Sequence, residues 1–211
     1  MKMTRIKLCG LTRDEDIITA NRLRPDYIGF VFWEKSRRAV SVKQAQRLKK
    51  LLDPSISAVG VFVDEDMDLV QELLKKGIID MAQLHGNEDK DYIKRLQENT
   101  GRKIIKALKI RDEIDADLIK KCPADFIMLD AGMGEGKSFD WDMISKSGFD
   151  IRDRLFLAGG LDPDNVEKAV KEVRPFAVDV SSGIETNGVK DSKKMEAFVR
   201  KVRMADLEEK G

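Results

Sequence analysis

Two reactive residues each follow a short apolar segment: Cys9 comes after Ile6–Leu8, and Asp130 comes after Phe126–Leu129. A thiol ordinarily titrates near about pH 8.5 and an aspartate near about 3.9, so both need a tuned environment to exchange protons at neutral pH. Lys7 shares one side of an extended strand with Cys9, where its charge would favour the thiolate. The two residues are therefore candidates for a base and an acid. The alternatives are a small buried thiol and a helix cap or loop anchor.

Two glycine- and serine-rich segments indicate a phosphate site. One leaves an apolar segment at Ala158 and leads through Asp162-Pro163 into a helix, and the other follows Asp179. Glycines let the backbone approach an anion closely, and helix-start N–H groups and hydroxyls donate to it. Tight turns would explain one such segment equally well, but two donor-rich segments in this order favour phosphate. The candidate ligands are Gly159, Gly160, Ser181, Ser182 and Gly183.

Arg38 and His85 follow two further apolar segments. The planar fork of Arg38 suits a substrate carboxylate, although exposed salt-bridging arginines are commoner. His85 could act as a base or hold a structural hydrogen bond. A single histidine and two distant cysteines argue against a zinc site. The string Gly134–Ser138 looks like part of a P-loop, but Asp130 stands near the place of its first glycine, so we reject nucleotide binding.

Apolar segments of strand length alternate with amphipathic segments of helical spacing along the whole chain. The expected strands are Ile6–Cys9, Tyr27–Phe32, Ala58–Val63, Met81–Leu84, Ile104–Leu108, Phe126–Leu129, Leu155–Ala158 and Ala177–Val180. The expected helices are Asp14–Leu23, Val42–Leu52, Met67–Lys76, Asp89–Glu98, Glu113–Lys121, Asp142–Ser147, Asp164–Val173 and Lys193–Leu207.

This alternation indicates a parallel sheet covered by helices, and about eight such units close a TIM barrel. An open doubly wound sheet is the alternative. It favours a glycine-rich fingerprint after the first strand, which Cys9-Gly10-Leu11-Thr12 does not provide. We therefore predict an α/β fold with a single (β/α)8 TIM-barrel domain over residues 1–211. In such barrels the active site lies where the strands end, which is where the candidate residues stand.

Composition excludes several classes of protein. The 211 residues carry 39 Lys and Arg against 38 Asp and Glu, a formal net charge of +1, so no long-range field would gather nucleic acid or an anionic membrane. No apolar run is long enough for a signal peptide or a membrane span. Cys9 and Cys122 are too few for a disulfide framework, and Cys122 is expected to be a buried structural thiol. We expect a cytoplasmic protein.

Seven segments, in order along the chain, resemble the motifs of one enzyme family. Lys7-Leu8-Cys9-Gly10-Leu11-Thr12 is similar to an opening Lys-Ile-Cys-Gly-Ile-Thr signature. The other segments are Gly29–Phe32 with Lys35–Arg38, Val59–Val63, Gln83–Gly86, Gly136–Trp141, Leu157–Leu161 and Arg174–Glu185. Together they span nearly the whole chain, and they resemble the phosphoribosylanthranilate isomerases of tryptophan biosynthesis.

The resemblance implies an Amadori rearrangement of N-(5-phosphoribosyl)anthranilate to 1-(2-carboxyphenylamino)-1-deoxyribulose 5-phosphate, with neither metal nor organic cofactor. It makes Asp130 the general acid that opens the sugar ring and Cys9 the general base that takes the proton from C2. Arg38 would hold the anthranilate carboxylate, the two glycine and serine segments the phosphate, and Asp179 would orient the sugar hydroxyls or the site itself. The implied partner is a small sugar phosphate, and association with other tryptophan-pathway enzymes is left open.

The chain departs from the family pattern in one loop and leaves rival functions to weigh. The stretch from Asp130 to Lys137 is shorter than usual, and Met133 stands where a glycine is common. Histidine-pathway isomerases resemble a two-aspartate design, against which Cys9 argues, and ribulose-phosphate epimerases need metal-binding histidines. A phospholigand-binding barrel without catalysis is a further alternative, against which the retention of both Cys9 and Asp130 argues.

Overall fold

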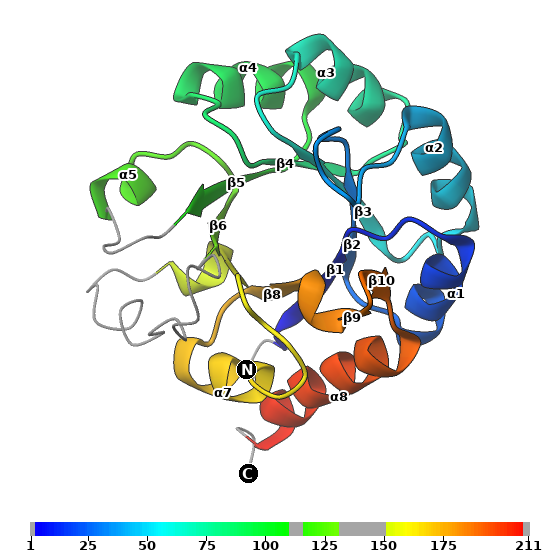
Figure 1. Ribbon diagram of the computed structural model, residues 1–211. Helices are drawn as coiled ribbons and strands as arrows, with labels where there is room; N and C mark the ends of the chain where they lie inside the picture. The colour runs from blue at the N-terminus through cyan, green and yellow to red at the C-terminus, as the bar shows by residue number, and fades with distance from the viewer. Residues whose placement is uncertain (1–2, 110–115, 131–150, 209–211) are drawn as a thin grey trace.

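A closed barrel of parallel strands, β1 to β8, forms the centre of the protein (Figure 1). The computed structural model describes residues 3–109, 116–130 and 151–208. The barrel strands are β1 (Arg5–Cys9), β2 (Tyr27–Val31), β3 (Ser57–Phe62), β4 (Met81–Leu84), β5 (Ile104–Lys109), β6 (Phe126–Asp130), β7 (Leu155–Ala158) and β8 (Ala177–Val180). The helices are α1 (Asp14–Leu23), α2 (Val42–Leu51), α3 (Met67–Lys75), α4 (Lys90–Thr100), α5 (Ala116–Lys120), α7 (Val166–Val173) and α8 (Ser192–Glu208), with short 3-10 turns η1 (Arg152–Arg154) and η2 (Ser182–Ile184).

The predicted TIM barrel is confirmed, and the open sheet is excluded because the last barrel strand, β8, pairs with the first, β1, and closes the sheet. Lys7 lies opposite Tyr27 of β2 on one side and opposite Asp179 of β8 on the other. Each barrel strand begins and ends within one residue of its predicted bounds. The predicted helix Asp142–Ser147 lies outside the described residues.

Side chains alternate across each strand, so every strand has one helix-facing and one interior row. Ile6 and Leu8 of β1 belong to the large cluster between the barrel and its helices, so Lys7 and Cys9 point inward. The smaller cluster inside the barrel consists of Tyr27, Val59, Met81, Ile105, Ala107, Phe126, Met128, Phe156, Ala158 and Ala177. The interior row therefore carries the inner core and, where the strands end, the polar residues predicted from the sequence.

The segment after β8 contains structure that the sequence did not predict. A two-stranded antiparallel hairpin, β9 (Glu185–Thr186) with β10 (Val189–Lys190), follows η2 and precedes α8 (Figure 1). Although its strands are short, Glu185 and Lys190 are both buried. The last helix then returns to the start of the chain, where the Asp206 carboxylate accepts the Thr4 N–H at 3.1 Å. None of the helices in the described ranges is long and apolar enough to cross a membrane.

Candidate active site

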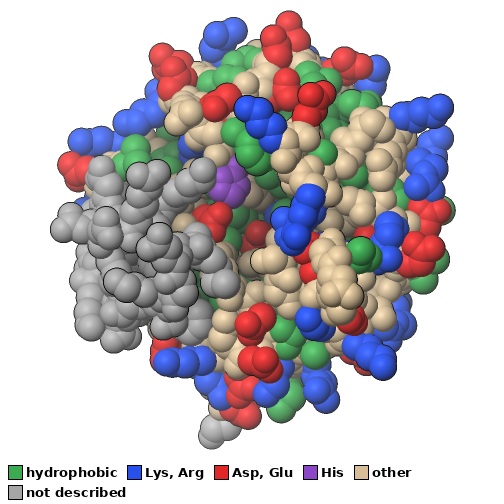
Figure 2. Space-filling view, viewed as in Figure 1, with side chains coloured by type: hydrophobic (Ala, Val, Ile, Leu, Met, Phe, Trp, Pro, Cys, Tyr) green, Lys and Arg blue, Asp and Glu red, His purple; other side chains and the backbone are tan. Residues whose placement is uncertain are grey.

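A cavity of about 460 Å³ opens where the barrel strands end, and Figure 2 shows this face hollowed near its centre. A cavity of this size suits a small ligand. Eight of the nine predicted site residues line it, and the ninth, Gly183, lies behind its wall. The lining predicted residues are Cys9, Arg38, Asp130, Gly159, Gly160, Asp179, Ser181 and Ser182.

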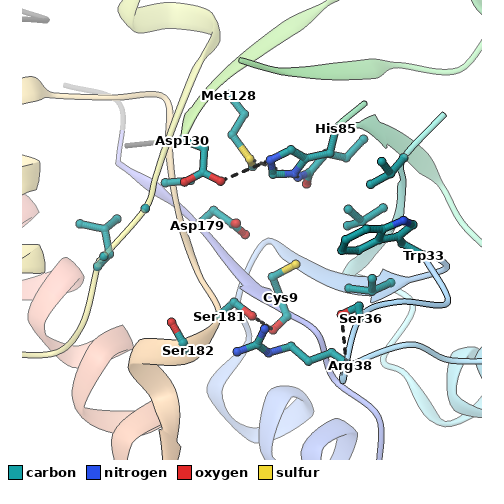
Figure 3. A pocket seen from close by; sticks show the side chains of 18 residues that line it. Cys9, Trp33, Ser36, Arg38, His85, Met128, Asp130, Asp179, Ser181 and Ser182 are labelled. Carbon is teal, nitrogen blue, oxygen red and sulfur yellow. Dashed lines mark hydrogen bonds and ion pairs between the residues drawn. The ribbon is translucent and has the colours of Figure 1, made fainter. Parts of the chain in front are cut away.

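Cys9 ends β1 with 7% of its surface exposed, and its thiol faces the cavity (Figure 3). Burial raises the pKa of the Cys9 thiol above its ordinary value, while the Lys7 ammonium lowers it and the Asp179 carboxylate raises it again. Lys7 therefore lowers the pKa of Cys9, as the sequence predicted, but burial raises this pKa by more. In the free enzyme, Cys9 is mainly a thiol at neutral pH.

Lys7 and Asp179 form a buried ion pair at the edge of the site. The Lys7 Nζ donates to Asp179 Oδ1 at 2.8 Å, and the Lys7 side chain has no exposed surface. Burial lowers the pKa of Lys7, but the Asp179 carboxylate and the neighbouring Cys9 together more than compensate and hold the pKa above its ordinary value. The sequence showed Lys7 only as a neighbour of Cys9, because strands β1 and β8 meet only on closure of the barrel.

Asp130 ends β6 on the opposite wall, beside His85 at the end of β4. The His85 Nε2 lies 3.3 Å from Asp130 Oδ2, and His85 Nδ1 lies 3.3 Å from the amide nitrogen of Gln83 (Figure 3). If the Gln83 amide donates to Nδ1, then Nε2 carries the hydrogen that faces Asp130. Among the described residues, Gln83 Oε1 is buried without a hydrogen-bond partner, so it can accept one from a ligand in the cavity.

Arg38 lies on the cavity wall and is held from behind by Glu185 of β9. The guanidinium donates from Nε at 2.6 Å and from Nη2 at 2.9 Å to the two carboxylate oxygens. Glu185 also accepts from Arg37 and from Lys190, each at 2.7 Å. Burial raises the pKa of Glu185, but hydrogen bonds from Arg38 and Lys190 bring it down to about 2. The sequence did not predict this carboxylate, which comes from the unpredicted hairpin.

The loops after β7 and β8 lie against one another. Gly159 and Gly160 both have positive φ, 90° and 67°, which favours glycine. A Cβ at Gly183 would stand 2.0 Å from the Leu161 carbonyl oxygen, so only glycine lets the two loops approach this closely. The predicted helix Asp164–Val173 begins two residues later, at Val166, because the Asp162 carboxylate accepts the N–H groups of Asp164 and Asn165 in an intervening turn.

The cavity also contains residues that the sequence analysis did not select. Trp33 follows β2 with 40% of its surface exposed and points towards the cavity, and apolar Val31, Val61 and Val63 lie on the same side. A tryptophan directly after a predicted strand is the one sequence signal that could have identified this apolar wall. No group of three or more His, Cys, Asp or Glu within the described ranges could hold a metal ion.

Residues 6–201 match the family model described as N-(5'-phosphoribosyl)anthranilate isomerase. The chain belongs to this isomerase family. The Clostridium kluyveri N-(5'-phosphoribosyl)anthranilate isomerase is 47% identical over 202 residues, covering 95% of this chain and 98% of that protein. The Endomicrobium trichonymphae isomerase is 43% identical over 206 residues, covering 95% and 99%.

A solved phosphoribosylanthranilate isomerase, crystallised with reduced 1-(o-carboxyphenylamino)-1-deoxyribulose 5-phosphate, is 35% identical, with a TM-score of 0.84 covering 96% of this chain and 100% of that one. The present chain is thus a phosphoribosylanthranilate isomerase of tryptophan biosynthesis with a TIM-barrel fold. The histidine-pathway, epimerase and non-catalytic alternatives are set aside by this finding. The expectations for Gly134–Ser138, Met133 and the short loop after Asp130 lie outside the described residues.

Proposed function

We propose that this cavity performs the isomerase reaction with Asp130 as general acid and Cys9 as general base. The carrying observation is that the two groups face one cavity from opposite walls, with the loops after β7 and β8 between them. An Amadori rearrangement needs one proton delivered to the sugar ring oxygen and one removed from C2. Two separated groups on a fixed barrel rim can carry out both transfers without moving.

In the first step, Asp130 protonates the ring oxygen of N-(5-phosphoribosyl)anthranilate, and the C1–O bond breaks to leave an iminium ion. Its carboxyl must hold a proton beforehand. His85, at 3.3 Å, is placed to orient the Asp130 side chain, and the carboxyl regains its proton from solvent after turnover. The proton that Asp130 loses becomes the proton of the new sugar hydroxyl, and no atom leaves the substrate.

In the second step, the Cys9 thiolate takes the proton from C2, and its electrons form the enolamine double bond to C1. The enolamine then tautomerises, losing the C2 hydroxyl proton and gaining one at C1, to give the ketone. Because burial keeps the pKa of Cys9 above its ordinary value, only a minor fraction is thiolate at neutral pH. Because Asp130 must be protonated while Cys9 is deprotonated, turnover should follow a bell-shaped pH profile with one limb from each group.

The ends of the substrate fit the two sides of the cavity. Arg38 and the apolar wall around Trp33 are proposed to receive the carboxylate and ring of the anthranilate, and the solved relative that holds a product-like compound supports this class of ligand. The loop containing Gly159 and Gly160 and the loop of Ser181 to Gly183 are proposed to hold the phosphate. Asp179 is proposed to act through Lys7. The free thiols Cys9 and Cys122 agree with the proposed cytoplasmic location.

The test is the loss of fluorescence when the purified enzyme meets freshly generated phosphoribosylanthranilate. Cys9→Ala and Asp130→Asn should each lower kcat by roughly a hundred- to ten-thousand-fold while the far-UV circular dichroism stays unchanged. The matched control is Cys122→Ser, which changes the other buried thiol. Cys122 lies just after α5, far from Cys9 along the chain, so this variant should retain full turnover. Near-normal turnover in either site variant would remove that residue from the mechanism.

A further inference from the structure

We propose that the buried pair of Lys7 and Asp179 sets how readily Cys9 loses its proton, with Lys7 favouring the thiolate and Asp179 opposing it. The inference deepens the proposed function, because its consequence for turnover rests on Cys9 being the base. Lys7 and Asp179 are positioning residues in this proposal, since they act on the reaction through the thiol.

The closure of the barrel creates this arrangement. Strand β1 carries Lys7 and Cys9 on its interior row, and Lys7 stands directly opposite Asp179 of β8 in the strand register. The Lys7 Nζ lies 2.8 Å from Asp179 Oδ1, and the two side chains are 0% and 10% exposed. With so little water to screen them, both charges act strongly on a neighbouring group.

The ammonium and the thiol also lie beside one another. A Cβ built at Gly29, on the neighbouring strand β2, would stand 2.6 Å from Cys9 Sγ and 3.2 Å from Lys7 Nζ. Two atoms that would both contact one carbon at Gly29 are themselves close neighbours. The glycine leaves the space in which the long Lys7 side chain reaches the thiol while it holds Asp179.

The opposing effects of the two charges agree with this geometry. The Lys7 ammonium lowers the pKa of Cys9, and the Asp179 carboxylate raises it by a smaller amount. Because Asp179, with Cys9 beside it, holds the pKa of Lys7 above its ordinary value, Lys7 keeps its proton and acts through its charge. The other charged or titratable groups facing the thiol across or along the cavity are Lys190 from β10, Arg38 from the loop after β2, His85 from β4 and Asp130 from β6.

A purely structural role is the competing explanation. The pair could act only as a strut that joins β1 to β8, in which case replacing it would alter stability and leave the thiol unaffected. A buried ion pair is seldom worth more to stability than apolar residues of similar volume. Its place next to the one thiol in the cavity favours the electrostatic role, and the two explanations predict different behaviour of Cys9.

The experiment measures Cys9 itself, in the free enzyme and without substrate. In a Cys122→Ser background, which leaves Cys9 as the only thiol, we would follow alkylation by iodoacetamide across about pH 6 to 10, because only the thiolate reacts. The variants are Lys7→Met and the double variant Lys7→Met/Asp179→Asn, since Asp179→Asn alone would also remove the charge that keeps the buried Lys7 protonated. The double variant leaves neither charge unpaired, so it keeps the test valid if Lys7→Met alone fails to fold.

The expected alkylation rates at neutral pH fall in one order: the background enzyme fastest, then the double variant, with Lys7→Met slowest. Removing a neighbouring opposite charge should slow alkylation by about tenfold or more in Lys7→Met, and removing Asp179 as well should speed it up again a few-fold in the double variant. The background and Lys7→Met should then also differ in the pH dependence of turnover, with the limb that reports the thiol at higher pH in Lys7→Met.

Superimposable alkylation profiles, or a slower reaction in the double variant than in Lys7→Met, would overturn the inference and leave the pair as a strut. Failure of the proposed function gives a different result. If Cys9→Ala kept its turnover, Cys9 would not be the base, yet the order of alkylation rates could still hold. The two failures are therefore distinguished by two separate measurements.

Discussion

The two ends of the barrel interior are built from the same strands and have opposite character. At the end where the strands begin, Tyr27, Phe126, Phe156 and Phe176 pack with ring centroids 4.8 to 5.6 Å apart, and the Arg5 guanidinium lies over Phe176 at 5.3 Å. At the end where the strands finish, the interior row carries a thiol, a buried ion pair, a carboxylate and an imidazole around an open cavity.

Strand β6 contains the whole contrast within one interior row. Phe126 packs in the aromatic end, Met128 is fully enclosed, and Asp130 faces the cavity, each two residues after the last. Ring packing at the aromatic end joins the strands inside the barrel. The polar end has no such packing and leaves room for the cavity. The residues that stabilise the barrel and the residues that react are therefore separated along the barrel axis. Mutations at the aromatic end should affect stability, and mutations at the polar end should affect turnover.

The largest effect expected at the aromatic end is on stability. Phe156→Ala removes a fully buried ring that contacts Tyr27, Phe126 and Phe176, so it should lower the free energy of unfolding by about 3–5 kcal/mol. The kcat of the molecules that remain folded should stay near the normal value. Urea unfolding and fluorescence turnover, measured on the same preparation, check both parts.

The matched partner of this variant is Asp130→Asn at the other end, which should lose turnover and keep stability. A Phe156→Ala enzyme that kept its stability would show that the ring cluster does not hold the barrel together. An Asp130→Asn enzyme that unfolded readily would show that the polar end also carries structure. Either result would break the separation between the two ends.

The sequence predicted the strands closely because buried parallel strands are continuous apolar runs bounded by turns. It also placed Cys9 and Asp130 at strand ends, and the family motifs assigned their roles. It could not show that Lys7 meets Asp179 or that Glu185 holds Arg38. Each of these contacts joins residues about 150 or more positions apart through closure of the barrel, so no local pattern records them.

The sequence also could not separate the interior row from the helix-facing row. Ile127 and Leu129 face the helices while Phe126 and Met128 face the interior, and all four belong to one uninterrupted apolar run. The β9–β10 hairpin was missed for another reason: strands of two residues have no periodicity to detect.

A smaller effect is expected where the two phosphate loops touch. In Gly183→Ala, the new Cβ would meet the Leu161 carbonyl oxygen at 2.0 Å, so one loop must move away from the other. We expect KM for phosphoribosylanthranilate to rise by about tenfold with little change in kcat, since the loops bind substrate and transition state alike. Steady-state kinetics would show this split.

Gly101→Ala is the control for this substitution. Gly101 has a positive φ of 63° at the end of α4, but a Cβ there would contact nothing within 4 Å. It should cost some stability and leave KM unchanged. A KM that stayed normal in Gly183→Ala would mean that the contact between the loops does not shape the phosphate site.

The smallest effect on KM concerns Glu185, which belongs to the polar end and yet supports structure. Glu185→Gln keeps the shape of the side chain but removes the charge that Arg38 and Lys190 contact, so it should lower the free energy of unfolding by roughly 2–3 kcal/mol at neutral pH. Because Arg38 loses its anchor, KM should rise a few-fold. Unfolding and kinetics of the two proteins at neutral pH test this pair of effects.

The pH dependence of the same variant gives the sharper result. Glu185 has a pKa of about 2 in the folded protein, below its ordinary value, so its contribution to stability is fully present above the unfolded-state pKa. It is lost as the pH falls from that value towards about 2. The difference in unfolding free energy between the wild type and Glu185→Gln should therefore shrink between pH 6 and pH 3, in urea titrations at both pH values. A difference that stayed constant would mean that the charge of Glu185 stabilises nothing, and that its contacts with Arg38 and Lys190 only fix the geometry of the cavity wall.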